Sequence, residues 1–137
     1  MHVTFSSSFA VDGSVLTGLG RGAQFLSLEW VRRELREKID LDCFPGTLNL
    51  RIPEQVWTAF YARRNSFLKI TDSTSARCPG YLQRVRLQAH DRIYPSAYLI
   101  LPELTMYKDV LEIIAAENLR QKLGLNDGDI VHVREYE

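Results

Sequence analysis

Hydrophobic and polar residues alternate along several short stretches of the chain, which is the pattern of half-buried β-strands. In residues 47–52, three aliphatic side chains fall on one face and three polar side chains on the other. Residues 81–89 alternate in the same way, and residues 93–101 are almost continuously apolar, which predicts a central strand. Further strands are predicted over residues 11–17, 110–115 and 130–135.

Apolar residues recur at spacings of three and four in residues 27–39, which predicts a helix capped by Ser27. The apolar stripe of this helix consists of Leu28, Val31, Leu35 and Ile39. A second helix is predicted from Pro53, a favoured first helical position, to residue 63. A short helix is expected over residues 118–123, ended by Gly124.

The order of these elements predicts a small, mainly β fold with short helices. Asp91 and Arg92 are expected to turn one strand into the next, and the polar stretch 71–80 to form an exposed loop. Many short strands with few helices indicate a β-barrel. The strands do not alternate regularly with helices, which argues against a doubly wound parallel sheet. The 137 residues are expected to form a single domain.

Composition excludes several classes of protein. The chain is 45% hydrophobic and 25% charged, so it is neither disordered nor collagen-like. Lys and Arg number 17 and Asp and Glu also 17, so no basic excess points to nucleic acid. The longest apolar run, 97–102, is too short to cross a membrane, and residues 1–8 lack an export signal. A cytoplasmic protein is therefore expected.

The two cysteines, Cys43 and Cys78, lie far apart in the sequence. Each lies just before a Pro-Gly pair that is expected to form a turn. A disulfide between them is one reading, and two free thiols in a reducing cytosol is the favoured one. The histidines are widely spaced and form no ligand pattern with the cysteines, so no zinc site is predicted.

Glycines occupy alternate positions in residues 18–23 (GLGRGA), directly after the first predicted strand. Such spacing lets a backbone approach a ligand closely and aim N–H groups at phosphate oxygens. It matches neither the Walker loop nor the dinucleotide fingerprint. A simple hairpin turn is the alternative.

Residues 45–50 (PGTLNL) combine a Pro-Gly turn with the start of a strand. Thr47 and Asn49 fall on one strand face, with Cα atoms about 7 Å apart. Their neutral oxygens suit Mg²⁺, which also takes phosphate oxygens as ligands. The alternative is an ordinary polar outer face of a half-buried strand. Because both donors are uncharged, Mg²⁺ is expected to bind weakly until a nucleotide is present.

Residues 112–120 (EIIAAENLR) place an acid in an apolar strand and then enter the short helix. Glu112 shares a strand face with Val110 and Ile114. It is either an edge carboxylate in water or paired with an arginine, or an acceptor for ligand N–H and hydroxyl groups. The N–H groups and the cationic Arg120 at the helix entry are candidates to hold a nucleotide.

In this order, the three motifs resemble the archaeal-type CTP-dependent riboflavin kinases. That family combines a GxGxG loop, the sequence PGTLN, an acid followed by Ile-Ile-Ala, then Leu-Arg and a closing Leu-x-Asp-Gly-Asp. The matching positions are residues 18–22, 45–49, 112–115, 119–120 and 125–129. The resemblance extends from about residue 12 to residue 133, and PGTLN at this spacing from the glycines is its most specific part.

The resemblance implies a six-stranded cradle-loop β-barrel that uses CTP and Mg²⁺ to convert riboflavin to FMN, a transferase of flavin biosynthesis. It implies nucleotide contacts from Gly18, Leu19, Gly20, Arg21, Gly22, Ala23, Glu117, Asn118, Leu119 and Arg120. It implies Mg²⁺ ligation by Thr47 and Asn49 and flavin contacts from Thr105 and Glu112. The implied partners are these small molecules alone, without nucleic acid, membrane or an obligate protein. No general base is identified.

The chain departs from the family pattern mainly on the acceptor side. Residues 104–106 read Leu-Thr-Met where the family tends to have Arg-Thr-His, and the span from Thr105 to Glu112 is one residue short. Arg21 and Ala116 replace a usual acid and a usual proline. The alternatives are therefore a CTP-dependent kinase of another small alcohol and a non-catalytic flavin- or nucleotide-sensing module. A DNA-binding swapped-hairpin barrel is disfavoured by the zero net charge.

A winged-helix regulator that some members of the family carry is absent from this sequence, so the chain is expected to be the catalytic module alone.

Overall fold

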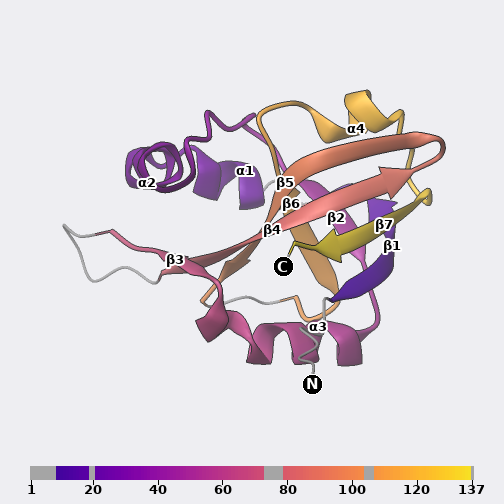
Figure 1. Cartoon of the computed structure of the whole chain (residues 1–137), viewed down its shortest axis with the longest axis horizontal. Coiled ribbons are helices and arrows are strands. Elements are labelled where there is room, and N and C mark those ends of the chain that lie inside the picture. Colours follow the sequence, from indigo (N-terminus) through magenta and orange to yellow (C-terminus); the bar gives the residue numbers. More distant parts are fainter. Residues whose placement is uncertain (1–8, 19–20, 73–78, 104–106, 137) are drawn as a thin grey trace, which may run out of the picture.

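The computed structural model describes residues 9–18, 21–72, 79–103 and 107–136, and its centre is a closed antiparallel β-barrel (Figure 1). Six strands hydrogen-bond in the order β4-β5-β6-β2-β1-β7, and a pairing of β4 with β7 closes the ring. They are β1 (Ala10–Leu16), β2 (Leu48–Arg51), β4 (Gly80–Ala89), β5 (Arg92–Pro102), β6 (Val110–Ile114) and β7 (Ile130–Glu135). The predicted six-stranded, mainly β fold is confirmed.

Aliphatic side chains from every barrel strand fill the interior, as the alternating pattern predicted. One fully or almost fully buried example from each strand is Val15, Leu50, Leu87, Leu99, Ile113 and Val133. Burying one such side chain stabilises the fold by about 1.5–3 kcal/mol. The inward row of β2 continues through Ile52, so the polar row that contains Asn49 faces away from the core.

The described part of the chain also contains four α-helices, one 3₁₀ helix and a short seventh strand. These are α1 (Arg21–Leu26), α2 (Glu29–Ile39), α3 (Glu54–Ala62), η1 (Arg64–Ser66), α4 (Leu119–Leu123) and β3 (Leu68–Ile70). β3 extends the sheet by pairing with the start of β4. The residue pattern did not predict α1, η1 or β3, because segments of three to six residues are too short to show a period. None of the described helices is long and apolar enough to span a bilayer.

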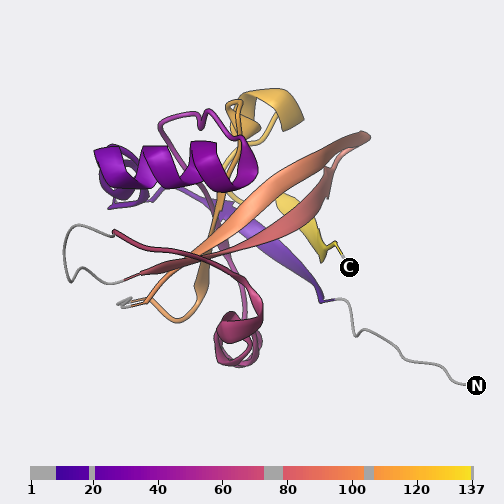
Figure 2. The same cartoon turned by 60° about the vertical axis from the view of Figure 1, so that its left-hand side comes forward.

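Helix α2 covers part of the outer face of the barrel, where a second apolar cluster forms (Figure 2). Val31 and Leu35 from the predicted stripe are fully buried there, against residues of β4, β5 and β6. The predicted cap was wrong. The helix begins at Glu29 after Leu28, and the Ser27 hydroxyl donates to the carbonyl of Gln24 at 2.6 Å. Ser27 therefore ends α1 instead of starting α2.

The turn between β4 and β5 lies one residue earlier than predicted. His90 and Asp91 form it, and Arg92 already pairs with Ala89 as the first residue of β5. His90 has a φ of 53°, the left-handed conformation that tight hairpin turns need. Residues 93–101 were predicted to be a central strand, and β5 does pair on both sides, with β4 and β6.

Both faces of β5 are buried near its end, which explains its continuous apolar sequence. Leu99 and Leu101 point into the barrel core, while Ile100 belongs to the cluster under α2. A strand covered on both faces has no reason to alternate, in contrast to β2 and β4.

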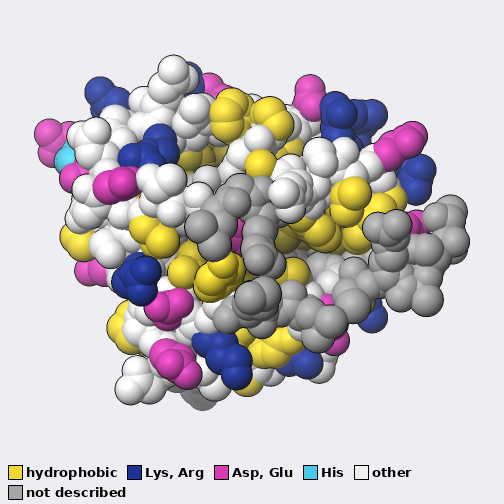
Figure 3. Space-filling view, turned by 180° about the vertical axis from the view of Figure 1, so that it is seen from behind, with side chains coloured by type: hydrophobic (Ala, Val, Ile, Leu, Met, Phe, Trp, Pro, Cys, Tyr) yellow, Lys and Arg dark blue, Asp and Glu magenta, His cyan; other side chains and the backbone are white. Residues whose placement is uncertain are grey.

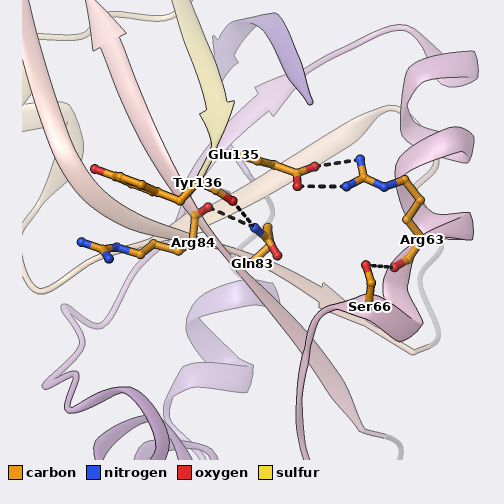
Figure 4. Close-up of polar contacts among 6 residues, drawn as sticks. All are labelled: Arg63, Ser66, Gln83, Arg84, Glu135 and Tyr136. Atoms are coloured by element: carbon orange, nitrogen blue, oxygen red, sulfur yellow. Dashed lines mark hydrogen bonds and ion pairs between the residues drawn. The ribbon is translucent and has the colours of Figure 1, made fainter. Parts of the chain in front are cut away.

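Helix α3 closes one end of the barrel and is tied to the last strand by a half-buried ion pair (Figures 1 and 4). Arg63, directly after the helix, donates two hydrogen bonds to the carboxylate of Glu135, at 2.9 and 3.0 Å. The Glu135 side chain is only 6% exposed, whereas that of Arg63 is 39% exposed. This bidentate pair links residues 72 positions apart in the sequence.

The thiol of Cys43 is free and half-buried, and it donates to the Phe44 carbonyl at 3.1 Å. Burial raises its pKa to about 11, so the thiol is protonated and unreactive at neutral pH. Cys78 lies outside the described residues.

Candidate active site

Strand pairing brings the three sequence motifs together at one end of the barrel. β2 lies between β1 and β6, and Asn49 is paired with Leu16 on one side and with Glu112 on the other. The glycine segment follows β1 immediately, so it leaves the sheet beside Asn49. Residues separated by more than 60 positions in the sequence thus share one small region.

Three oxygen-bearing side chains meet there. The Thr47 hydroxyl lies 3.3 Å from the side-chain oxygen of Asn49 and also hydrogen-bonds the Glu112 carboxylate. Burial raises the pKa of Glu112, and the hydrogen bond from Thr47 opposes part of that rise. The site therefore contains a half-buried carboxylate beside the two neutral donors, which the sequence motifs did not place together.

Two glycines pack closely against the side chains of this site. A Cβ at Gly18 would lie 2.2 Å from the side-chain nitrogen of Asn49. A Cβ at Gly22 would lie 2.5 Å from Glu112 Oε1 and from Thr47 Cγ2, and 2.8 Å from Thr47 Oγ1. All four distances are far below van der Waals contact. The motif was interpreted as backbone that approaches a ligand, and the structure shows that it also approaches the site's own side chains.

Gly22→Ala is therefore expected to damage the site more than the fold. The added methyl group must push aside Thr47, whose branched side chain has few alternative rotamers, and the Glu112 carboxylate. Because a displacement of about 1 Å costs on the order of 100-fold in catalysis, we expect turnover to fall at least that much. The measurements are initial rates and thermal unfolding. Gln24→Ala, an exposed change in the same helix, is the control. Near-normal turnover in Gly22→Ala would contradict the close packing described here.

A cavity of about 160 Å³ adjoins these oxygens. Thr47 lines both the cavity and the oxygen cluster, so the two form one continuous site. Leu48, Ile113, Ala115 and Leu119 supply apolar lining, and Phe44 contributes an aromatic ring. Glu117, Asn118 and Arg120 bring polar groups from the start of α4.

The polar side chains at the start of α4 are already engaged with the protein. Asn118 caps the helix by accepting a hydrogen bond from the N–H of Gln121 at 3.3 Å. Glu117 is paired with Lys122 at 2.7 Å, which lowers its pKa, and Arg120 with Asp127 at 3.0 Å. A ligand in the cavity therefore meets oriented, neutralised polar groups instead of a free charge.

The structure describes most, but not all, of the predicted site residues. Gly18, Gly22, Thr47, Asn49 and Glu112 converge, and residues 117–120 line the adjoining cavity. Leu19, Gly20 and Thr105 lie outside the described residues. Residues 18–23 are not one continuous loop as expected, because Arg21, Gly22 and Ala23 form the first turn of α1.

Phe44 lines the cavity but was not among the predicted site residues. It lies immediately before the Pro-Gly turn and lines the cavity with Gly46 and Thr47. The sequence did offer a signal for Phe44, because it is an aromatic residue next to a motif that was predicted to bind a ligand.

Comparison with known proteins decides the family. The family model described as "Domain of unknown function DUF120", with the short name CTP-dep_RFKase, matches residues 15–134. The chain belongs to the CTP-dependent riboflavin kinase family. This match contains every described part of the candidate site, from Gly18 to Arg120.

Curated relatives support the same assignment. The chain is 36% identical to a riboflavin kinase of Archaeoglobus fulgidus, over 90% of this chain and 53% of the relative. It is 34% identical to a riboflavin kinase of Saccharolobus solfataricus, over 94% of this chain and 75% of the relative. A third riboflavin kinase, from Pyrobaculum islandicum, is 34% identical over 94% of this chain and 61% of its own length. The chain thus spans about half to three-quarters of the length of these relatives.

Proposed function

We propose that this protein is a kinase that transfers the terminal phosphoryl group of CTP to riboflavin, giving FMN and CDP. The observation that carries the proposal is the meeting of three separate motifs at one end of the barrel, around Gly22, Thr47 and Glu112. Phosphoryl transfer depends on positioning and charge stabilisation more than on covalent help from the protein. A compact cluster of oxygens beside a cavity of nucleobase size meets that need.

The residues present fit a magnesium ion. The hydroxyl of Thr47 and the amide oxygen of Asn49 are hard oxygen donors 3.3 Å apart, on a strand face that points away from the core. Among the described residues no cluster of three or more His, Cys, Asp or Glu offers a rival site. When bound with the nucleotide, Mg²⁺ would neutralise charge on the phosphates. We propose that Thr47 and Asn49 hold it.

The donor and acceptor are assigned to different sides of this cluster. We propose that residues 18–23 cover the phosphates of the nucleotide and that residues 117–120 contact the rest of it from the cavity. Glu112, together with Thr105, is proposed to contact the flavin. The terminal ribityl hydroxyl oxygen bonds to the γ-phosphorus, the bond from that phosphorus to the bridging oxygen breaks, and CDP leaves. The hydroxyl proton passes to solvent.

One assay tests this function directly. The protein is incubated with riboflavin, Mg²⁺ and each nucleoside triphosphate in turn, and the flavins are separated by chromatography. FMN is expected with CTP, less of it with the other nucleotides, and none after chelation of the metal. No FMN with any nucleotide would refute riboflavin phosphorylation. If CTP still binds in that case, the acceptor is a different alcohol, which the altered residues 104–106 already suggest.

Glu112→Gln is expected to weaken riboflavin binding by about one to two decades. A charge-assisted hydrogen bond contributes roughly 1.5–3 kcal/mol, and the amide keeps the shape while losing the charge. Quenching of riboflavin fluorescence measures this loss, and calorimetry with CDP in the absence of metal is expected to show almost no change. Unchanged riboflavin affinity would remove Glu112 from the acceptor site.

The same variant is expected to keep or slightly gain stability at pH 8. Burial raises the pKa of Glu112, so the folded state favours the protonated acid. The stability that this group contributes is present at low pH and is lost as pH rises through the raised pKa. At pH 8, burial of the ionised carboxylate therefore lowers the free energy of unfolding, and substitution by glutamine removes this penalty. Thermal unfolding at pH 5 and pH 8 separates this effect from the loss of binding.

A further inference from the structure

Phe44 is held firmly at the edge of the cavity. Its N–H donates to the carbonyl of Ala115 at 2.8 Å, and its own carbonyl accepts from the N–H of Gly46 at 2.8 Å. The segment that carries it, between α2 and β2, runs beside the chain that enters α4 (Figures 1 and 2). The backbone of Phe44 is thus fixed on both sides before any ligand binds.

The ring itself lies over the turn that leads into β2. A Cβ at Gly46 would come within 3.0 Å of the ring atom Cε2 of Phe44. The glycine therefore lets the ring lie against the backbone of the turn, on the wall of the cavity. Such a position orients a flat aromatic surface beside Thr47, which belongs to the oxygen cluster.

Phe44 differs from the other phenylalanines of the described chain in what it packs against. Phe60 and Phe67 belong to the barrel core, Phe9 packs against that core, and Phe25 packs against the cluster under α2. Phe44 is half-buried and belongs to neither cluster. It lines the cavity instead.

The cavity matches one ring of a nucleobase better than a whole nucleotide. Its volume of about 160 Å³ is below the roughly 300–1,000 Å³ of pockets that hold drug-sized ligands. Aliphatic residues such as Leu48 and Leu119 line the same cavity, and its polar groups come from Thr47 and from the start of α4. A flat ring placed here would have its sugar and phosphates at Thr47.

Figure 3 shows the molecule from behind, where Lys and Arg side chains are interspersed with Asp and Glu around hydrophobic side chains.

We propose that Phe44 stacks on the nucleobase of the phosphate donor and that the small cavity it lines selects a one-ring base. This inference rests on the proposed function, because it names the side chain that binds the base of the same nucleotide. Stacking on an aromatic side chain tolerates any base, so Phe44 supplies affinity. The size of the cavity supplies the preference for a pyrimidine over a purine.

The test compares a ligand that has a base with one that lacks it. Calorimetry measures the binding of CDP and of inorganic tripolyphosphate, both with Mg²⁺, to the wild type and to Phe44→Ala, Phe44→Leu and Phe44→Tyr. Replacing a stacking aromatic side chain with alanine weakens binding by roughly 5- to 150-fold. We expect Phe44→Ala to lose CDP affinity within that range and Phe44→Tyr to remain within about threefold of the wild type. Tripolyphosphate affinity is expected to be unchanged in all variants.

Phe44→Leu separates the loss of stacking from a loss of folding, because leucine retains apolar volume without a flat ring. It is expected to lose most of the CDP affinity that alanine loses, at a wild-type unfolding temperature. An equal loss for CDP and tripolyphosphate in both variants, or no loss for CDP, would overturn the stacking role. Such a result together with FMN formation by the wild type would leave the proposed function standing. Wild-type protein that binds neither CDP nor CTP would overturn both.

Discussion

Asn49→Ala is expected to lower the rate of FMN formation by about 100-fold or more while the protein remains folded. Removing one group that stabilises charge in a transition state typically costs 100- to 1,000-fold. Asn49 occupies the middle strand of the site, between Leu16 and Glu112, and its oxygen lies 3.3 Å from the Thr47 hydroxyl. Its side chain lies outside the barrel core, so the loss concerns the site. Turnover and circular dichroism are the measurements.

A second readout tests the metal role without relying on activity. Mn²⁺ serves as a paramagnetic probe for Mg²⁺, and its binding in the presence of CDP is expected to weaken by at least tenfold in Asn49→Ala. Asn65→Ala, an exposed change in η1, is the matched control and is expected to leave both measurements unchanged. A folded Asn49→Ala protein with normal turnover and normal Mn²⁺ binding would show that this residue does not hold the metal.

Arg63→Ala is expected to be the most destabilising change at a charged residue in the described chain. The variant leaves the carboxylate of Glu135, which is only 6% exposed, without the two hydrogen bonds that satisfy it. Removing one partner of a buried ion pair costs about 3 kcal/mol, because a buried charge remains uncompensated. For a domain of this length, the midpoint of thermal unfolding should fall by roughly 10 °C.

Two further variants separate this pair from an ordinary surface contact. Arg51 and Asp109 also form an ion pair at 2.8 Å, but their side chains are 59% and 40% exposed. Arg51→Ala is therefore expected to cost less than about 1 kcal/mol. Adding Glu135→Gln to Arg63→Ala should recover part of the lost stability, because the stranded charge is removed. Equal effects of Arg63→Ala and Arg51→Ala would show that burial does not distinguish the two pairs.

Local pattern was sufficient to predict the longer elements. The helix that ends at Ile39, the helix that follows Pro53 and the strand 130–135 were predicted within about one residue, because each has a clear period or a clear terminating residue. Ser27 was wrongly predicted to cap α2, because a serine before an apolar stripe is typical of a helix cap. The short helix α1 lies directly before it and takes its hydroxyl. Propensity could not reveal a six-residue helix that begins in a glycine motif.

The sequence by itself determined the barrel strands, the polar row with Thr47 and Asn49, and the family resemblance, because these depend on residues close together in the chain. Only the tertiary structure decided that Glu112 lies against Thr47 and that Gly22 leaves room for both. It alone showed that Phe44 lines a cavity with residues of α4 and that Arg63 satisfies Glu135. These relations depend on strand register and on loop packing between distant segments. Neither is encoded in the spacing of residues along one segment, because each requires the barrel to be closed first.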